Sequence, residues 1–363
     1  MKMSLPPEKI VRRFFPGTEE VKTTIPGQGN INDTFLLSHR GRRIILQRIS
    51  ASVFVKPQLL ISNLEQLSRH LRSQKVCCDR RWEDAVLVPA TDGATSIVDD
   101  NGRLWRALSY ISDSISLSRA TTLKHAEETG WALGRFHRRV TDLAIEKMHP
   151  PLPGFHVLSC YIKEYQQLAE RAALDSSSTV QWCRSVIAQG QDTALSLERA
   201  RDAGATALSV VHGDPKIGNV LFDRTSRLAL SIIDLDTVGP GLRLHDIGDC
   251  LRSVCNRGGE SGRPEQARFD LDRCKAALQG YFREAGHLLS PVEKGLIYDG
   301  VAAITFELGL RFFNDYLQGG IYFKCSSPEE TLHKAVVQFA LFTDITAKKE
   351  AIRTLTLQTA QEA

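Results

Sequence analysis

The first third of the chain carries short apolar runs separated by turn-forming residues, a pattern typical of β-strands. Strands are predicted from the apolar runs at residues 35–37, 42–49, 85–89, 94–98 and 104–111. The last two runs flank Asp99-Asp100-Asn101-Gly102, which is a strong turn signal. We therefore expect these two runs to form a hairpin within an antiparallel sheet.

Helical spacing of apolar residues dominates the chain after residue 112, and one earlier helix is expected at residues 57–72. The segment 123–143 carries an apolar face of the kind that a buried core helix presents. This change of pattern divides the chain into an N-terminal domain, residues 1–111, and a helical C-terminal domain, residues 112–363.

The segment at residues 210–241 holds the main group of candidate catalytic side chains. An apolar pair leads into a His-Gly-Asp turn ending at Asp214, Lys216 and Asn219 follow it, and Asp234 ends a second apolar run. Phosphoryl transfer of the protein-kinase type needs a carboxylate base, a metal-binding amide and a metal-binding carboxylate in this order. We therefore predict Asp214 as the base for an attacking hydroxyl group. Asn219 and Asp234 offer the oxygen ligands that Mg²⁺ prefers, and Lys216 is expected to neutralise the transferred phosphoryl group.

The same residues also allow a simpler interpretation as a surface turn. Asp214 and Asn219 are common turn formers, and Asp234 would cap the strand before it. Turn chemistry does not require the complete order of residues, so we favour the catalytic interpretation. His212 is expected to brace the loop through hydrogen bonds and not to act as a base.

Composition narrows the class of protein. The chain of 363 residues is 42% hydrophobic and 24% charged, which is ordinary for a globular protein with a sizeable core. The net charge of +4 is spread along the sequence and does not favour a nucleic-acid-binding face. Eight cysteines without a C-x-x-C pair argue against a zinc site and favour reduced thiols. Because we find no apolar signal segment and no run of membrane-spanning length, we expect a cytoplasmic protein that binds no membrane.

The sequence beyond Asp234 carries three more short motifs. They are Asp236-Thr237, Pro240-Gly241 and Gly248-Asp249-Cys250-Leu251-Arg252. Together with the segment 210–241, they resemble the aminoglycoside/choline kinase-like phosphotransferases, and among these the N-acetylhexosamine 1-kinase group. The resemblance runs from about residue 10 to residue 345. It implies an α+β, protein-kinase-like fold with a small antiparallel-sheet N-lobe and a larger helical C-lobe, with ATP and Mg²⁺ bound between them.

The resemblance assigns the glycine-containing turn at residues 26–34 to the nucleotide. In this fold such a turn lies over the ATP phosphates, because glycine lets backbone N–H groups approach them. The implied nucleotide contacts are Gly27, Gly29, Asn32, Thr34 and Arg48. Arg48 takes the place of the strand cation that holds the phosphates, with Glu65 as its expected ion-pair partner. The alternatives are a plain hairpin for the turn, a solvent-exposed arginine for Arg48 and an ordinary exposed glutamate for Glu65.

The resemblance also implies an acceptor side. Asn30 stands where the N-acetylhexosamine 1-kinase group usually has a histidine, and it is assigned to the substrate. Arg311 and Tyr322 match that group's R-F-x-x-D-Y-L segment and the Y-F pair that follows it. Arg311 is expected to reach the carbonyl of an acetamido group, and Tyr322 to supply a wall and a hydroxyl group. An ion pair between Arg311 and a nearby carboxylate is the alternative.

These features predict an ATP- and Mg²⁺-dependent small-molecule kinase, and the resemblance implies the anomeric hydroxyl of an N-acetylhexosamine as acceptor. An aminoglycoside or choline/ethanolamine kinase of the same fold is the first alternative, and its cationic acceptor would need carboxylates or aromatic rings. A catalytically inactive nucleotide-binding regulator is the second, against which the complete set of Asp214, Asn219 and Asp234 argues. The resemblance also gives Asp246 the role of bracing the catalytic loop.

Overall fold

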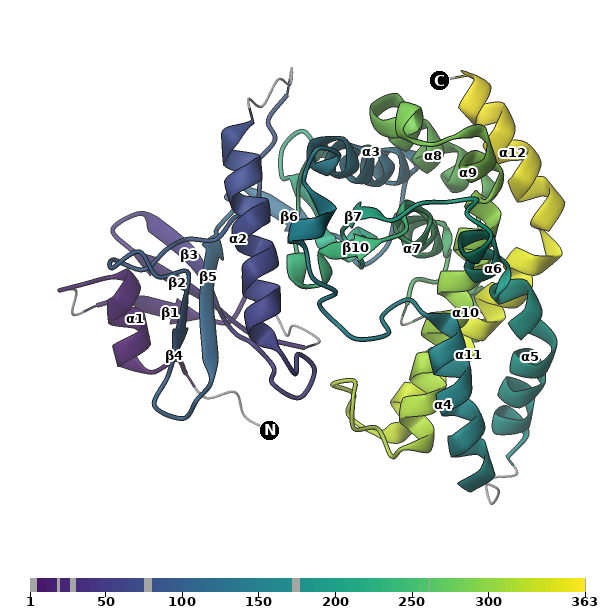
Figure 1. Cartoon of the computed structure of the whole chain (residues 1–363), viewed down its shortest axis with the longest axis horizontal. Coiled ribbons are helices and arrows are strands. Elements are labelled where there is room, and N and C mark those ends of the chain that lie inside the picture. Colours follow the sequence, from purple (N-terminus) through teal and green to yellow (C-terminus); the bar gives the residue numbers. More distant parts are fainter. Residues whose placement is uncertain are drawn as a thin grey trace.

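The structure is a computed structural model of the 363-residue chain, and it describes residues 5–17, 20–26, 31–74, 80–171, 177–260 and 262–362. A β-sheet stands at one end of the molecule and a larger body of helices at the other (Figure 1). We call these the small lobe and the large lobe. The helix α2 (Pro57–Ser73) lies between them.

The small lobe is built on a five-stranded antiparallel sheet in the order β1-β2-β3-β5-β4. Its strands are β1 (Lys22–Thr24), β2 (Asp33–His39), β3 (Arg42–Arg48), β4 (Ser96–Val98) and β5 (Leu104–Ser109). Alternate side chains of these strands, among them Phe35, Leu46 and Trp105, are buried in one core together with α1 (Glu8–Phe14). These alternate side chains therefore form the inner face of this sheet.

The strands follow the predicted apolar runs with one exception. The run at 42–49 forms β3, and the runs at 94–98 and 104–111 form the hairpin of β4 and β5. The run at 85–89 lies in the described part of the chain, but it makes only an isolated bridge to β5 at Leu87, so the strand prediction there is wrong. The run lies beside the end of β5 that β4 leaves open, where Val88 N donates to Ala107 O and Ser109 N donates to Val86 O, each at 2.9 Å, and this contact is too short to form a strand.

The helix α2 ties the small lobe to the large one. It forms the helix predicted at 57–72, and Pro57 begins it at a position where a missing N–H breaks no hydrogen bond. Its buried leucines belong to the core of the large lobe. On the same helix, the side chain of Asn63 bonds to His149 N at 2.8 Å, His149 O at 2.7 Å and Val238 O at 2.8 Å.

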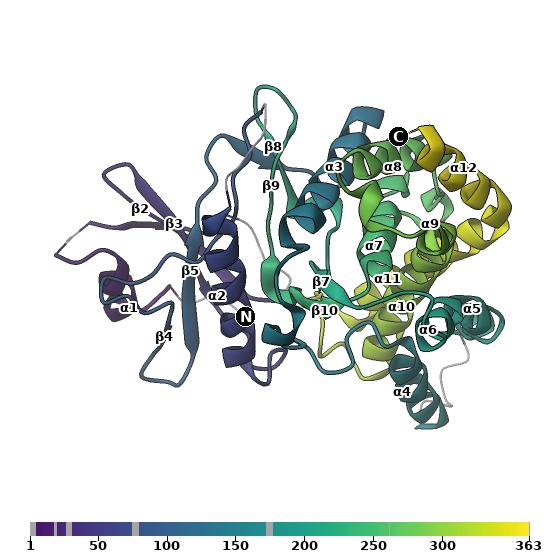
Figure 2. The same cartoon turned by 45° about the horizontal axis from the view of Figure 1, so that its top comes forward.

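The large lobe is built mainly from helices. They are α3 (Leu123–Val140), α4 (Leu158–Arg171), α5 (Ser178–Ala194), α6 (Ser196–Asp202), α7 (Arg243–Cys255), α8 (Leu271–Ala285), α9 (Pro291–Gly295), α10 (Ile297–Leu317), α11 (Pro328–Ala347) and α12 (Lys349–Glu362). In the views of Figures 1 and 2, α3 and α8 lie side by side, so closely that a Cβ atom on Gly130 would fall 1.9 Å from Ala277 O. Glycine is required there because the two backbones touch. The core helix predicted at 123–143 is α3.

Short strands hold the segment 210–241 in the large lobe. β7 (Ser209–Val211) pairs with β10 (Gly239–Gly241), while β6 (Ser114–Ser116), β8 (Val220–Asp223) and β9 (Ala229–Ile232) form a separate sheet. Figure 2 shows both sets of strands between α2 and α7. The loops that carry the candidate catalytic residues therefore begin and end on paired strands.

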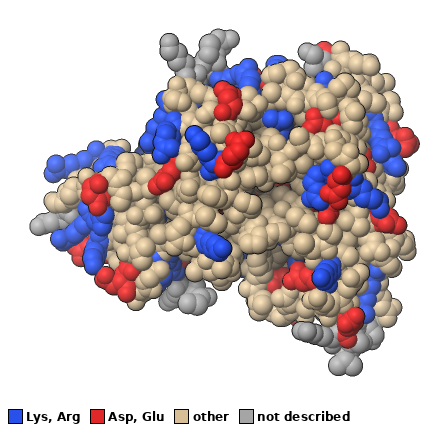
Figure 3. Space-filling view, viewed as in Figure 1, with Lys and Arg blue, Asp and Glu red and all other residues tan. Residues whose placement is uncertain are grey.

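The surface and the cysteines add three observations. On the face shown in Figure 3, basic and acidic side chains are interspersed and neither sign covers a large area. Among the described residues, no helix combines the length and apolar character that crossing a lipid bilayer requires. The cysteines at positions 160, 183, 250, 255, 274 and 325 are free thiols, and Cys77 and Cys78 lie outside the described residues.

Candidate active site

The His-Gly-Asp turn is held by a buried carboxylate on α7. Asp246 accepts hydrogen bonds from His212 N at 2.7 Å and Gly213 N at 2.8 Å, and His137 Nε2 of α3 lies 2.9 Å from it. Burial alone would raise the pKa of Asp246, but these neighbours hold it below its ordinary value, so the carboxylate is charged. Asp246 thus stands in the bracing position that the resemblance implies.

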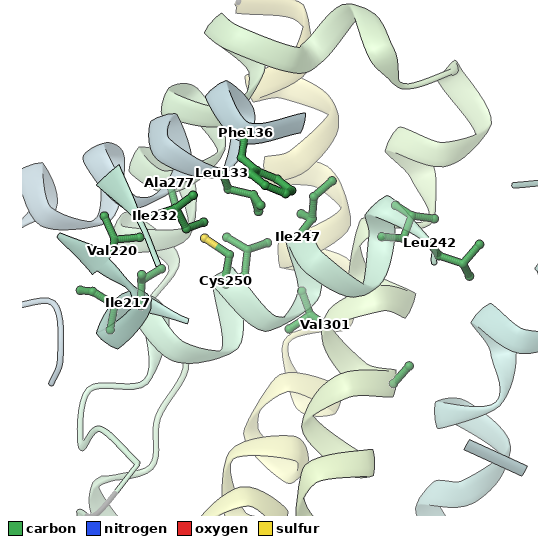
Figure 4. Close-up of a cluster of buried hydrophobic side chains, with 14 of the residues drawn as sticks. Leu133, Phe136, Ile217, Val220, Ile232, Leu242, Ile247, Cys250, Ala277 and Val301 are labelled. Atoms are coloured by element: carbon green, nitrogen blue, oxygen red, sulfur yellow. The ribbon is translucent and has the colours of Figure 1, made fainter. Parts of the chain in front are cut away.

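Apolar packing fixes the same helix against the loop. Figure 4 shows Ile247 and Cys250 of α7 near Phe136 of α3. Ile217 and Val220, which follow the His-Gly-Asp turn, belong to the same buried cluster. Because a close-packed interior tolerates few voids, this cluster opposes movement of the loop relative to α7.

Two residues of the turn have structural roles. Gly213 has a φ of +87°, and a Cβ atom there would lie 2.8 Å from Thr237, so only glycine fits. The buried ring of His212 donates from Nε2 to Ile233 O at 3.0 Å and accepts at Nδ1 from Asp214 N at 3.2 Å. Burial lowers the pKa of His212 and keeps its ring neutral. His212 therefore occupies the bracing position predicted for it.

Asp214 lines a cavity of about 210 Å³, which we call the inner cavity. Its Oδ2 atom accepts hydrogen bonds from Lys216 Nζ at 2.7 Å and Asn219 Nδ2 at 3.0 Å. Burial alone would lower the pKa of Lys216, but Asp214 and the neighbouring Glu260 raise it, so the ammonium group is charged. The structure thus brings three of the predicted residues into one hydrogen-bonded group.

Asp234 follows β9 in a left-handed conformation with a φ of 66°. Beside it, Ile233 N donates to Asn219 O at 2.8 Å, so the two predicted metal ligands belong to adjacent backbone segments. The side chain of Asp234 is exposed, yet the surrounding protein and the charges of Asp236 and Asp214 raise its pKa. This excess of negative charge fits a bound cation. Among the described residues, no group of three or more His, Cys, Asp or Glu side chains is arranged to hold a metal ion.

The predicted nucleotide contacts fall into two sets. Three assigned residues lie outside the described part of the chain: Gly27, Gly29 and Asn30. Asn32 is buried, and its amide donates to Asp236 and accepts from Ser50 N at 2.8 Å. Thr34 Oγ1 accepts a hydrogen bond from Gln47 Nε2 at 3.2 Å. The side chain of Asn32 therefore connects the small lobe to the segment that follows Asp234.

Arg48 has a different partner from the one expected. It forms an ion pair with Asp33, with Nε 2.8 Å from Oδ2. Glu65 instead accepts a hydrogen bond from Thr95 Oγ1, so the prediction of an Arg48–Glu65 pair is wrong. The register of the sheet explains this, because Asp33 lies directly opposite Arg48 on the neighbouring strand.

Aromatic rings enclose the guanidinium group of Arg311. Its Cζ atom lies between 5.2 and 5.9 Å from the ring centroids of Phe155, Tyr161, Tyr322 and Phe323. The nearest carboxylate is that of Glu307, 3.9 Å from Nη1. Arg311 is 15% exposed, so the rings and Glu307 are its main surroundings. Cation–π attraction stabilises a charge held in this way.

Tyr322 is positioned by a buried carboxylate. Asp315 accepts hydrogen bonds from the backbone N atoms of Ile321, Tyr322 and Phe323, at 2.9, 2.7 and 3.1 Å. The loop after α10 is therefore fixed, and the ring of Tyr322 lines the inner cavity. Arg311 lines it too, so both acceptor residues predicted within the described chain share this cavity with Asp214.

The match to a family model decides the family. A model described as APH, phosphotransferase enzyme family, matches residues 22–286. The chain belongs to the APH phosphotransferase family. The match covers the sheet of the small lobe, the His-Gly-Asp turn and the helices through α8.

Solved structures extend the likeness of this APH phosphotransferase to nearly the whole chain. An aminoglycoside phosphotransferase from Alicyclobacillus acidocaldarius has a TM-score of 0.66 at 16% identity, and the alignment covers 100% of this chain and 98% of the other. A microcompartment-associated aminopropanol kinase gives 0.68 at 14% identity, over 95% and 97%. Choline kinase from Cryptosporidium parvum gives 0.57 at 14% identity, over 97% and 98%. These values show the fold, and the predicted two-lobed, protein-kinase-like α+β architecture is confirmed.

One residue of this APH phosphotransferase that the sequence analysis missed is Arg106 of β5. It is 1% exposed, and its Nη2 atom donates to Asp236 and, at 2.8 Å, to Gln47 Oε1. Asp236 of the large lobe therefore binds two small-lobe side chains, Arg106 and Asn32. The sequence does contain a signal for Arg106, because it is the one charged residue in an otherwise mostly apolar strand. A charge buried in such a strand needs a partner of opposite charge or a hydrogen-bond acceptor.

Asp249 and Arg252 of α7 also line the inner cavity, and the sequence analysis named them within a motif but assigned them no role. Arg252 Nε donates to Asp249 Oδ1 at 2.8 Å. Asp249 Oδ2 and Arg252 Nη1 are buried, and neither has a hydrogen-bond partner among the described residues. Buried polar atoms are normally paired, so this donor and acceptor suit a polar ligand. Asp246, Asp249 and Arg252 follow one another at intervals of three residues, so all three lie on one side of α7.

Proposed function

We propose that this APH phosphotransferase is an ATP- and Mg²⁺-dependent kinase that phosphorylates the anomeric hydroxyl of an N-acetylhexosamine. The observation that carries the proposal is the inner cavity, where the carboxylate of Asp214 and the caged guanidinium of Arg311 line the same space. A carboxylate suits the activation of a hydroxyl group, and a guanidinium suits an uncharged oxygen acceptor.

Asp214 would accept the proton of the attacking hydroxyl. Both side-chain bonds from Lys216 and Asn219 fall on Oδ2, which leaves Oδ1 for the acceptor. Lys216 would supply positive charge beside this carboxylate, where negative charge of the transferred group needs stabilisation. Because the transition state of phosphoryl transfer is loose, accurate placement of Asp214 matters more than its strength as a base.

Asn219 and Asp234 would hold the magnesium ion, which neutralises phosphate charge when it is bound. We keep Gly27, Gly29, Asn32, Thr34 and Arg48 as the proposed nucleotide side. A spectinomycin phosphotransferase solved with ADP has a similar fold, with a TM-score of 0.54 at 10% identity, and supports the proposal of a nucleotide ligand. The bonds of Asn32 and Arg48 to Asp236 and Asp33 give these two side chains a positioning role beneath the nucleotide.

The acceptor class follows from the environment of Arg311. Aromatic rings that could bind a cationic acceptor are already in contact with the guanidinium group. An aminoglycoside or choline would also meet the positive charge of Arg311 itself. A neutral sugar avoids both problems, because the guanidinium can donate to an acetamido carbonyl. Tyr322 and Asn30 are the further proposed sugar contacts.

A screen of ATP consumption tests this proposal. The panel contains N-acetylhexosamines, unsubstituted hexoses, aminoglycosides, choline and an amino alcohol, and phosphorus NMR locates the phosphate on each product. We expect turnover with an N-acetylhexosamine and a phosphate on its anomeric oxygen. Turnover with amine-bearing acceptors alone would refute the proposal.

A kinase of amine-bearing alcohols is the second candidate function. It is favoured by Asp249, whose unpartnered Oδ2 atom at the inner cavity could bind an ammonium group. The aminopropanol and choline kinases with similar folds are consistent with it. The same screen separates the two candidates.

A further inference from the structure

A second cavity, of about 390 Å³, adjoins the inner cavity, and we call it the outer cavity. The two cavities share four wall residues: Leu152, Arg311, Tyr322 and Phe323. Asp214 lines only the inner cavity, whose volume of about 210 Å³ is below the usual range for small-molecule sites, roughly 300–1,000 Å³. Ser52 and Val53 of the small lobe line the outer cavity, so it lies where the two lobes meet. The larger of the two cavities is therefore the one that Asp214 does not line.

Asn314, which lines the outer cavity, has a buried acceptor atom without a donor. Asn314 is 2% exposed, and its Nδ2 atom donates to Tyr161 O at 3.1 Å and to Glu164 Oε2 at 3.0 Å. Both partners are acceptors, so the orientation of the amide is fixed and Oδ1 remains an acceptor. No described residue donates to Asn314 Oδ1. A buried acceptor of this kind calls for a donor from a ligand or a water molecule.

Glu164 adds a second set of acceptor sites to the same wall. Its two oxygens accept from Asn314 Nδ2 and from Gln318 Nε2, each at 3.0 Å. Within the described residues, no Lys, Arg or His side chain forms an ion pair with Glu164. A carboxylate has about four lone-pair sites, so two or so remain. The wall formed by Glu164 and Asn314 therefore favours a ligand rich in hydrogen-bond donors.

We propose that the acceptor has two parts, a phosphorylated sugar in the inner cavity and a second, hydroxyl-bearing sugar unit in the outer cavity. This inference rests on the proposed function, and it narrows the substrate class to an N-acetylhexosamine that carries a further sugar. Hydroxyl groups satisfy Glu164 and Asn314 without placing positive charge beside Arg311. The glycosidic link would pass along the shared wall at Tyr322, away from the anomeric hydroxyl that faces Asp214.

Kinetics with two acceptors test the second subsite. An N-acetylhexosamine is compared with the same sugar carrying a hexose on a ring hydroxyl other than the anomeric one. We expect the disaccharide to have a KM at least about 10-fold lower, the scale of one hydrogen bond to a charged group. Glu164→Gln is expected to raise the KM of the disaccharide about 10-fold more than that of the monosaccharide. Glu170→Gln, at an exposed site on the same helix, is the matched control and should change neither.

The outcomes distinguish this inference from the function on which it rests. Phosphorylation of the monosaccharide with an equal or better kcat/KM than the disaccharide overturns the second subsite and leaves the proposed function standing. An equal loss with both sugars in Glu164→Gln also overturns it, because Glu164 would then act on the fold alone. Turnover with amines only overturns both proposals. Thermal unfolding of each variant checks its folding, and the wild-type comparison of the two sugars stands without any variant.

Discussion

Asp246→Asn is the substitution that tests how the catalytic loop is held. The carboxylate is completely buried, and Oδ2 accepts from His212 N at 2.7 Å while Oδ1 accepts from Gly213 N at 2.8 Å. Asparagine keeps the shape but replaces one oxygen by an amino group. Whichever atom is replaced, a backbone N–H of the turn then faces another donor. One charged hydrogen bond is lost and one buried donor is left unpaired.

The magnitude follows from those two losses. A hydrogen bond to a charged group contributes about 1.5–3 kcal/mol, and an unpaired buried donor adds a cost of similar size, so we expect about 3 kcal/mol of destabilisation. For a chain of this size, that corresponds to a fall in the unfolding midpoint of roughly 4 °C. Since Asp214 follows Gly213 directly, release of the turn should also displace the base, and a shift of about 1 Å costs roughly 100-fold in kcat.

Thermal unfolding and steady-state kinetics on the folded fraction measure the two effects separately. Asp299→Asn is the matched control, because Asp299 is also a buried carboxylate on a helix, α10. It accepts hydrogen bonds from Ser196 Oγ at 2.7 Å and from Arg353 Nη2 at 3.3 Å. We expect it to lower the unfolding midpoint without changing kcat. Wild-type kcat in Asp246→Asn, measured per folded molecule, would refute the role of Asp246 in placing the base.

Three further predictions concern the base, the metal and the small lobe. Asp214→Asn should preserve the fold and ATP affinity while lowering kcat by at least about 100-fold, which calorimetric titration with ATP and turnover assays measure separately. Asp234→Ala should abolish turnover at any practical Mg²⁺ concentration, and Asn219→Ala should be milder because an amide carries no charge; a magnesium titration of the rate checks both. Although burial opposes it, hydrogen bonds from Trp105 and the backbone lower the pKa of Asp99 to about 2. Because the pKa is lowered, the charged carboxylate stabilises the fold above its ordinary pKa, near pH 4, by about 1 kcal/mol after solvent screening, and this contribution is lost as the pH falls toward 2. The difference in free energy of unfolding between wild type and Asp99→Asn should therefore narrow from pH 7 to pH 3.

The parts of the site that could be predicted from sequence are local. Asp214, Lys216 and Asn219 lie within six consecutive residues, so their order alone places them on one loop. Strands such as β2 and β3 bury alternate side chains with a period of two, which a sequence records directly. The same holds for α3, whose apolar face repeats with helical spacing.

Contacts between distant segments could not be predicted in this way. Asn32 and Asp236 are 204 positions apart, and Arg106 and Asp236 are 130 apart, so their pairing depends on how the lobes meet. The assigned role of Asn32 as a nucleotide contact did not anticipate this connection. The aromatic cage of Arg311 likewise joins rings from three separate segments, and periodicity within one helix carries no information on them.

The central claim is that the enzyme selects a neutral sugar as acceptor. The most direct test is to measure which acceptors the variant Arg311→Ala prefers. Michaelis constants are measured for an N-acetylhexosamine, for an aminoglycoside and for ATP, in wild type and variant. We expect the KM of the sugar to rise about 10- to 150-fold, the effect of losing one hydrogen bond to a charged group, while the KM of ATP stays nearly unchanged. An unchanged KM for the sugar, or a gain of activity toward the aminoglycoside alone, would contradict the claim.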